Sequence, residues 1–313
     1  MIVHFDNVIF SSSSGPNTFG ARLARALFEQ GHTVADTGTG ADVSLVFIEP
    51  TGAPLARRVV QRLDGIWSRP QDFATKNTSM RLLYQRADAV VWQSTFDMTM
   101  VLKHFGLPGH VLGRVIHNGT SPVPVNEITI PKLLDMRGAY DRIYACSANW
   151  HGQKRLAANV ALFDHLRTFH PNSCLIVLGS NPDHRATGPH VFYAGSVDEA
   201  TYLQVYSAAD WLLHLAWGDH CPNTVIEALS QGTPVACSEV GGTKELVGGY
   251  GHVLKDAPFD FELYDYNTPP PIDVTQVADL PPRQSLDASS IADIDIGHVA
   301  LKYVKLFEQV CGA

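Results

Sequence analysis

The chain has 313 residues, of which 45% are hydrophobic and 17% charged, a composition that excludes a disordered chain and predicts about two folded domains. No stretch reaches the roughly 18 consecutive apolar residues of a transmembrane helix, so we expect no membrane-spanning segment, while peripheral membrane contact stays open. The five cysteines are scattered without a C-x-x-C pair, and the first residues do not resemble a signal peptide. Both observations indicate a reducing, cytoplasmic location.

The formal net charge of −8 is unevenly distributed, because residues 1–145 carry a net +2 and residues 146–313 a net −10. The positive charge of the first part gathers in one segment, at Arg57, Arg58, Arg62, Arg69, Lys76, Arg81 and Arg86. Such a patch can attract an anionic substrate, although a solvated basic face is the simpler interpretation.

In the first half of the chain, apolar runs typical of buried strands alternate with helical patterns. Strands are expected at 2–10, 41–48, 58–63, 89–93 and 111–117, and helices at 18–30, 79–87 and 96–105. This βαβα succession predicts a mostly parallel sheet covered by helices.

The same pattern restarts near residue 130 and predicts a second α/β domain of similar size. Strands are expected at 142–147, 175–179, 191–194, 211–214 and 234–237, and helices at 130–137, 155–169, 198–207, 224–231 and 243–247. Residues 256–288 are rich in proline and predict a surface connection, and the spacing of apolar residues over 289–309 predicts a final helix.

Ligands of open α/β sheets lie beyond the carboxyl ends of the strands, in loops that lead into helices. The first such loop, residues 11–20, holds four serines followed by Gly15 and Pro16. Small residues there let backbone N–H groups approach an anion at a helix N-terminus, and a simple tight turn explains them equally well. The loop has neither the lysine of a Walker A motif nor a G-x-G-x-x-G pattern.

The segment 217–235 reads as a loop, a helix opened near Asn223, and a buried strand. Asp219 precedes this helix and Glu227 lies about one turn inside it, so both carboxylates can face an inter-domain cleft. Carboxylates accept paired hydrogen bonds from vicinal hydroxyls, and the first N–H groups of the helix, at Asn223 and Thr224, suit a phosphate.

Here the sequence resembles the retaining glycosyltransferases of family four, the glycosyl transferases group 1. Asp219 and Glu227 stand at the two positions of that family's Glu-x7-Glu signature, and Glu-Ala-Leu-x-x-Gly-Thr-Pro-Val follows at 227–235. Three further segments resemble, in turn, its Gly-Gly-x-x-Glu loop, its phosphate-binding loop and its domain junction: 241–247, 149–156 and 115–119.

This resemblance implies an α/β fold of the GT-B type, with two Rossmann-like parallel-sheet domains that face a cleft. We therefore expect an N-terminal acceptor domain at 1–137, a nucleotide-sugar domain at 138–288, and a C-terminal helix at 289–313 that returns to the N-terminal domain, as is common in GT-B chains. The implied catalytic residues are Lys154 at the diphosphate, Asp219 at the transferred sugar, and Asp64, which falls where many members place a histidine. The implied donor-binding residues are Gly15, Arg155, Asn223, Thr224, Glu227 and Gly242, with Glu227 at the ribose.

Two departures from the family pattern shape these assignments. The arginine usually found before the lysine is replaced by Asn149, so Arg155 is the remaining candidate for a second positive charge. Pro222 lacks an N–H group where the pattern has a glycine, which leaves Asn223 and Thr224 as amide donors.

The expected function is metal-independent, retaining transfer of a sugar from a nucleoside-diphosphate sugar to a hydroxyl of a glycan, a lipid-linked molecule or a small molecule. We expect no metal and no cofactor besides this co-substrate, because no ligand set appears at a usual spacing. Two alternatives remain open. Transfer to hydroxylated bases of modified DNA fits the basic segment, but the overall acidity disfavours a nucleic-acid partner. A nucleotide-sugar-binding protein without turnover fits the departures at Asn149 and Asp219.

Overall fold

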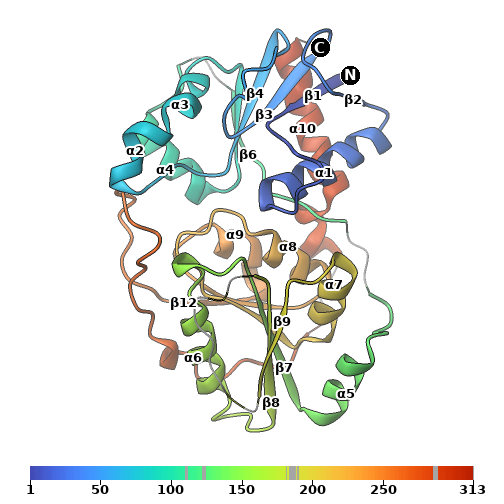
Figure 1. Ribbon diagram of the computed structural model, residues 1–313, viewed down its shortest axis with the longest axis vertical. Coiled ribbons are helices and arrows are strands. Elements are labelled where there is room, and N and C mark those ends of the chain that lie inside the picture. The colour runs from blue at the N-terminus through green and yellow to red at the C-terminus, as the bar shows by residue number, and fades with distance from the viewer. Residues whose placement is uncertain are drawn as a thin grey trace. The chain divides into compact units, whose positions relative to one another are not determined.

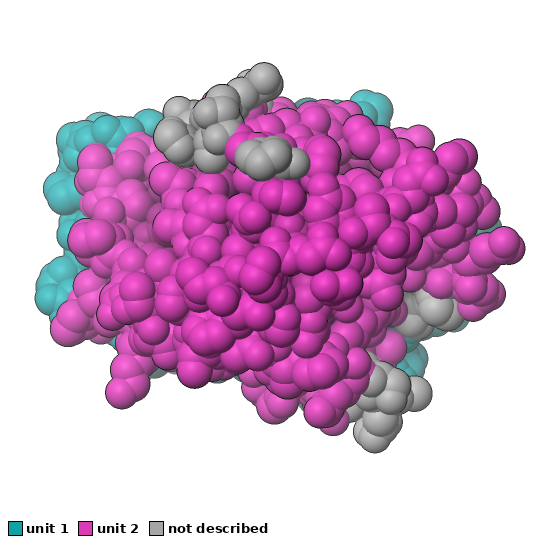
Figure 2. All heavy atoms as spheres, turned by 90° about the horizontal axis from the view of Figure 1, so that it is seen from below, with its two compact units in different colours: residues 1–121, 260–264, 292–313 teal, residues 122–259, 265–291 magenta. Residues whose placement is uncertain are grey.

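The computed structural model describes residues 1–109, 112–121, 125–180, 182, 188, 190–284 and 288–312, with the backbone alone at 288–290. The chain divides into two compact units, coloured separately in Figure 2. Unit 1 comprises residues 1–121, 260–264 and 292–313, and unit 2 comprises residues 122–259 and 265–291. The first division falls after residue 121, whereas the sequence placed it after residue 137, because helix α5 (Pro131–Ala139) packs on elements of unit 2.

Unit 1 is built on a six-stranded parallel sheet with the strand order β2-β1-β3-β4-β5-β6 (Figure 1). The strands are β1 (Ile2–Asp6), β2 (Thr33–Ala35), β3 (Val43–Phe47), β4 (Arg58–Leu63), β5 (Ala89–Trp92) and β6 (Leu112–Val115). All five residues of β3 are buried, and all but Ser44 are apolar, so this central strand shows little alternation.

Helices cover both faces of this sheet. They are α1 (Gly15–Glu29), α2 (Pro70–Lys76), α3 (Thr78–Tyr84), α4 (Thr95–Phe105) and α10 (Ile296–Cys311). α1 and α10 pack on each other and on one face, where Phe19, Tyr303 and Phe307 join the core of the strands. α3 lies on the other face, where the Gln61 side chain of β4 donates a hydrogen bond to the carbonyl of Met80.

Unit 2 is built on a second six-stranded parallel sheet, with the order β12-β11-β10-β7-β8-β9. Its strands are β7 (Arg142–Ser147), β8 (Ser173–Leu178), β9 (Val191–Gly195), β10 (Trp211–His214), β11 (Val235–Ser238) and β12 (His252–Leu254). Counted from β7, this is the order 3-2-1-4-5-6 of a Rossmann fold. The direction of winding therefore reverses between the neighbouring strands β7 and β10.

The helices of unit 2 besides α5 are α6 (Leu156–Leu166), α7 (Glu199–Ala208), α8 (Asn223–Ser230) and α9 (Thr243–Val247). Short 3-10 helices are η1 (Gly152–Lys154), η2 (Gly248–Tyr250), η3 (Val274–Gln276) and η4 (Ala288–Ile294). The proline-rich segment is more than the expected surface connection, because Val277 and Leu280 are fully buried in the core beside α6.

The structure confirms the expected fold class of two parallel α/β sheets. Three elements were missed: the edge strands β2 and β12, each three residues long, and α2, in which no residue is buried. An element that buries little apolar surface leaves no hydrophobic period in the sequence.

Candidate functional site

The reversal of winding in unit 2 marks where a ligand is expected. The chain leaves β7 toward β8 on one side and leaves β10 toward β11 on the other, and open α/β sheets bind ligands beyond the carboxyl ends of two such strands. The loop after β7 runs through η1 and carries Lys154, and the loop after β10 carries Asp219. The topology alone therefore points to these two residues.

Asp219 is the centre of a charged cluster. Its Oδ2 atom lies 2.5 Å from Nζ of Lys154 and 3.2 Å from Nε2 of His214. The side chains of Asp219, Lys154 and His214 are 13%, 20% and 5% exposed, so the charges are largely shielded from salt. Burial by itself would raise the pKa of the Asp219 carboxyl, but the Lys154 ammonium and the His214 ring outweigh burial and hold that pKa well below its usual range.

Both charged groups of the cluster keep hydrogen-bonding capacity. Within the part of the chain that the structure describes, no group donates a hydrogen bond to Oδ1 of Asp219, and Nζ of Lys154 donates only to Asp219. An ammonium has three N–H donors, and a carboxylate oxygen can accept two hydrogen bonds. A ligand can therefore bind both residues without breaking their ion pair.

Asn159 connects the loop after β7 to the loop after β10. This α6 side chain is 1% exposed, donates from Nδ2 to the carbonyl of Lys154 (3.1 Å), and accepts at Oδ1 from the N–H of Leu215 (3.1 Å). A second link joins the N–H of Trp217 to the carbonyl of Gln153 at 2.9 Å. Fixing both backbones fixes the position of Lys154 relative to Asp219.

The loop after β11 contacts the backbone of Asp219. The N–H of Gly242 donates to the Asp219 carbonyl at 2.8 Å. Gly241 has a φ of +132°, and a Cβ there would lie 2.7 Å from the same oxygen, so the position requires glycine. Gly242 was expected to contact the donor, but its amide already donates a hydrogen bond to the Asp219 carbonyl. Gly242 therefore helps to position Asp219.

The start of α8 presents the positive end of a helix. Asn223 and Thr224 are partly exposed, whereas residues 225–230 are buried. The carbonyl of Pro222 accepts from the N–H groups of Val225 and Ile226, which closes the first turn. The first amides of a helix have no acceptor within it and carry partial positive charge, which favours an anion at Asn223 and Thr224.

Glu227 is a buried carboxylate one turn into α8. It is 6% exposed, and Oε1 accepts a hydrogen bond from the Tyr202 hydroxyl of α7 at 3.3 Å. Burial raises the pKa of Tyr206 well above its usual value, and the Glu227 charge adds to that effect. Glu227 is therefore no solvated surface residue, and Tyr202 is a partner that the sequence did not reveal.

Arg155 does not have the place expected from the sequence. Its guanidinium donates hydrogen bonds to the Asp256 carboxylate from Nη1 (2.5 Å) and Nη2 (3.2 Å). Nη2 also donates to the carbonyl of Pro270 (2.5 Å). The side chains of Arg155 and Asp256 are 4% and 0% exposed. A left-handed backbone, with φ of +49°, turns Arg155 away from its neighbour Lys154. Its charge is neutralised inside unit 2, so Arg155 serves stability.

Asp64 and Gly15 belong to unit 1, whereas the other expected site residues belong to unit 2. Asp64 directly follows β4 and accepts from Nη1 of Arg62, whose Nη2 donates to Oδ1 of Asn118 at 2.6 Å. Burial raises the pKa of Asp64, and Arg62 opposes this only in part. Gly15 is the exposed first residue of α1, and the preceding carbonyl closes the first helical turn.

His220, next to the cluster, is partly buried in unit 2. Burial lowers its pKa to about 4, an effect that Asp219 opposes and Lys154 reinforces, so the ring is neutral near pH 7. Among the described residues, no three His, Cys, Asp or Glu side chains gather so that they could hold a metal ion. None of the helices in the described ranges has the length and apolar character needed to cross a bilayer.

Asn159, Tyr202 and His214 were not identified from the sequence as partners of the site. One signal was available for Asn159, because it interrupts an otherwise apolar face of α6 formed by Leu156, Val160 and Phe163. A buried polar side chain of this kind needs hydrogen-bond partners. No comparable pattern marks Tyr202.

Residues 142–261 match the family model described as glycosyl transferases group 1. No curated protein matches the sequence. Among solved structures, the chain is similar to HepE of Anabaena in complex with UDP-glucose, with 16% identity, a TM-score of 0.67, and coverage of 99% of this chain and 100% of that one. It is similar to sucrose-phosphate synthase from Thermosynechococcus elongatus (15%, TM-score 0.64, coverage 99% and 98%). It is also similar to the catalytic domain of starch synthase IV from Arabidopsis thaliana bound to ADP and acarbose (12%, TM-score 0.63, coverage 100% and 99%).

The three likenesses cover nearly the whole chain and show that its fold is GT-B. The segment matched by the family model contains the Lys154–Asp219 cluster and α8. The resemblance to the glycosyl transferases group 1 is thereby confirmed. The chain has the GT-B fold, its residues 142–261 match the glycosyl transferases group 1 model, and this match and the fold together support a glycosyltransferase.

Proposed function

We propose that the chain is a retaining glycosyltransferase that transfers a sugar from a nucleoside-diphosphate sugar to an acceptor hydroxyl without a metal ion. The observation that carries this proposal is the pairing of Lys154, from the loop after β7, with Asp219, from the loop that leads directly into α8, at the reversal point of unit 2. A cation, a carboxylate and a positive helix end suit a diphosphate attached to a hydroxyl-rich sugar.

The diphosphate is the part of the donor that becomes more negative during the reaction. The bond between the anomeric carbon and the diphosphate oxygen breaks, and the departing oxygen takes the electron pair. Lys154 and the first amides of α8 are fixed before the reaction, so they stabilise this charge without reorganising. They supply the positive charge that a metal ion provides in other transferases, and this supports metal independence.

The hydroxyl groups of the donor have two carboxylates available in unit 2. We assign Oδ1 of Asp219 to a hydroxyl of the transferred sugar, because that oxygen has capacity left and its side chain is 13% exposed. We assign Glu227 to the ribose hydroxyls. In the resembled family, the acceptor's proton is thought to pass to the leaving phosphate on the face that the acceptor attacks, which retains the anomeric configuration. Asp64, from unit 1, is assigned to the reacting sugar by the same resemblance.

The proposal is tested first by donor binding. The panel begins with UDP-glucose, which HepE holds, and ADP-glucose, because starch synthase IV holds ADP. A donor at about 100 times its dissociation constant adds roughly 2.7 kcal/mol to stability, which a thermal-shift assay detects. If no nucleoside diphosphate or sugar derivative shifts the melting temperature, the donor assignment is wrong.

Turnover is tested with the donor that binds best. Slow release of free sugar without an acceptor separates an enzyme from a binding protein, and EDTA should leave the rate unchanged. NMR of the first released anomer reports the stereochemistry. An inverted product, or loss of activity in EDTA with rescue by manganese, would overturn the corresponding part of the proposal.

A further inference from the structure

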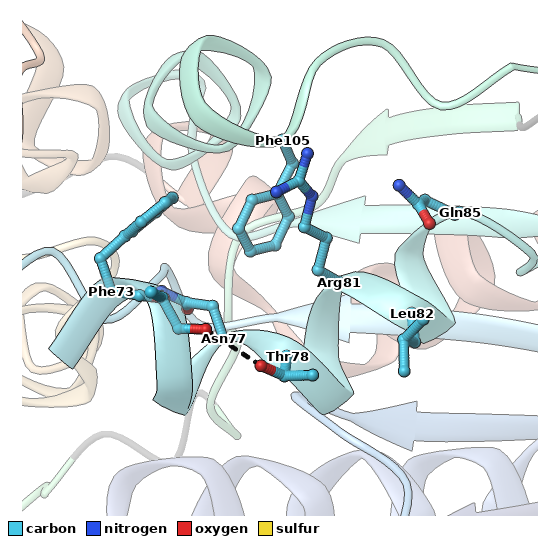
Figure 3. A pocket seen from close by; sticks show the side chains of 8 residues that line it. Phe73, Asn77, Thr78, Arg81, Leu82, Gln85 and Phe105 are labelled. Carbon is cyan, nitrogen blue, oxygen red and sulfur yellow. Dashed lines mark hydrogen bonds between the residues drawn. The ribbon is translucent and has the colours of Figure 1, made fainter.

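Unit 1 carries a surface pocket that the proposed function does not use. It has a volume of about 310 Å³ and lies beside α2, α3 and the end of α4 (Figure 3). Its lining includes Phe73, Asn77, Thr78, Arg81, Gln85 and Phe105. The volume is at the lower end of the range for small-molecule sites.

Two aromatic rings form the apolar part of this pocket. The ring centroids of Phe73 and Phe105 lie 6.4 Å apart with an interplanar angle of 51°. The Arg81 guanidinium lies 5.9 Å from the centroid of Phe105, and Figure 3 shows the Arg81 side chain extending beside that ring. A flat apolar group placed against the exposed parts of these rings would lie near the Arg81 cation.

Arg81 has no counter-ion within the part of the chain that the structure describes. Its segment, residues 67–86, holds four cations, at Arg69, Lys76, Arg81 and Arg86, and a single carboxylate, Asp72. That carboxylate already pairs with Arg69 (3.4 Å) and Lys76 (3.2 Å). The positive charge at Arg81 is therefore surplus on a chain whose net charge is −8, and it favours an anionic ligand.

The polar groups of the pocket lie in a row on α3. Thr78, Arg81 and Gln85 are three and four residues apart, so they share one side of the helix and its C-terminal extension. The Thr78 hydroxyl donates to the carbonyl of Ala74 at 3.0 Å, which leaves its oxygen as an acceptor. The Gln85 side-chain amide makes no hydrogen bond to a described residue. Arg81 and Gln85 together offer a forked cation and a neutral N–H donor, which is the set that binds a carboxylate or a phosphate.

Asn77 lines the pocket and fixes the backbone around it through its side-chain hydrogen bonds. Its side-chain Nδ2 donates to the carbonyls of Trp67 (3.0 Å) and Phe73 (2.9 Å), and its Oδ1 accepts from the N–H of Trp67 (3.0 Å). The residue is 1% exposed and joins the end of α2 to the start of α3. The spacing between Phe73 and Arg81 is therefore fixed before a ligand arrives.

We propose that this pocket binds a small aromatic acid. Its carboxylate or phosphate ester would bind Arg81 and Gln85, and its ring would pack against Phe73 and Phe105. The acid pairs with the guanidinium through two parallel N–H···O bonds, and the aromatic body covers apolar surface that water now touches. This site lies outside unit 2 and does not depend on the donor assignment.

The test uses the whole chain and saturation-transfer NMR, which detects binding in the millimolar range. The probes are phenylacetate, phenyl phosphate, neutral 2-phenylethanol and inorganic phosphate. The variant is Arg81→Gln, and the matched control is Arg86→Gln, because Arg86 is an exposed cation of the same segment that does not line the pocket. We expect Arg81→Gln to weaken binding of the aromatic acids about tenfold, as loss of a charged hydrogen bond does, and Arg86→Gln to change it less than about twofold.

Each outcome decides a part of the proposal. Binding of phenylacetate alone assigns a carboxylate, and binding of phenyl phosphate alone assigns a phosphate ester. The proposal is overturned if 2-phenylethanol binds as tightly as the acids, if inorganic phosphate binds as tightly as phenyl phosphate, or if the two variants behave alike. It is also overturned if neither aromatic acid binds.

Discussion

Removing the charge of Lys154 should cost more stability than removing the charges of Lys154 and Asp219 together. The two variants are Lys154→Met and the double variant Lys154→Met/Asp219→Asn. The first leaves a carboxylate that is 13% exposed with only His214 as a partner, whereas the second removes both charges of the ion pair.

The magnitude follows from the geometry of the pair. At 2.5 Å, with an effective dielectric constant of about 20, the attraction is about 7 kcal/mol before the cost of desolvating both groups. Breaking a buried pair on one side typically costs about 3–5 kcal/mol, and we expect about 3 here because His214 remains. Replacing both partners costs far less, about 1 kcal/mol, because no charge is left buried alone. The double variant should therefore be about 2 kcal/mol more stable than the single one.

Urea unfolding followed by tryptophan fluorescence measures this difference, since the buried Trp150 and Trp217 lie in the two loops that carry the pair. The matched control is Lys103→Met in unit 1, which breaks the pair of Lys103 with Glu262. Those side chains are 36% and 64% exposed, so the control should lose less than about 1 kcal/mol. The reasoning fails if the double variant is no more stable than Lys154→Met.

Glu227→Gln should lower kcat/KM for the donor by about ten- to two-hundred-fold through loss of a charged hydrogen bond, with Glu199→Gln, an exposed carboxylate of α7, as the control. Arg155→Met should lower stability by about 3–5 kcal/mol, because it leaves the buried Asp256 carboxylate without its ion-pair partner. Calorimetry at low temperature should find the donor affinity unchanged. A loss of donor affinity would instead indicate that Arg155 contributes to the donor site. The pKa of Asp219 is depressed in the folded state, so its contribution is complete above the unfolded pKa of about 3.9 and is lost as the pH falls toward the folded value. Denaturation curves at decreasing pH should thus show a steeper loss for the wild type than for Asp219→Asn, and parallel curves would contradict the assignment.

The sequence predicted the central strands well because burial leaves short apolar stretches in them, such as residues 143–146 and 211–213. The expected ranges 58–63, 142–147 and 211–214 coincide with β4, β7 and β10. Near the edges of the sheets this signal fades, which is why β2 and β12 were missed. The proline-rich segment was misread because its core residues Ile272, Val274, Val277 and Leu280 stand at unequal spacings between prolines and match neither a strand nor a helix period.

The sequence indicated the loops that carry Lys154 and Asp219, but not the contacts that the neighbouring residues make. Lys154 and Arg155 are adjacent cations, but Lys154 pairs with Asp219 and Arg155 with Asp256. The partner of Arg155 is Asp256, which lies 101 residues further along the chain. A short motif carries no information on such a distant contact, and likewise nothing near Asp64 predicts the buried bridge from Arg62 to Asn118.

The return of α10 to unit 1 gives the protein an order of assembly. The core that begins with the first strand is closed by Val299, Tyr303 and Phe307, and these are synthesised after all of unit 2. During translation, unit 2 can fold while the sheet of unit 1 still has an uncovered apolar face, which is the condition in which nascent chains aggregate or bind chaperones. A stop codon just before α10 would spare every residue of the Lys154–Asp219 cluster and still leave an unfinished fold. Quality control in the cell would then act on unit 1, and not on the unit that carries Lys154 and Asp219.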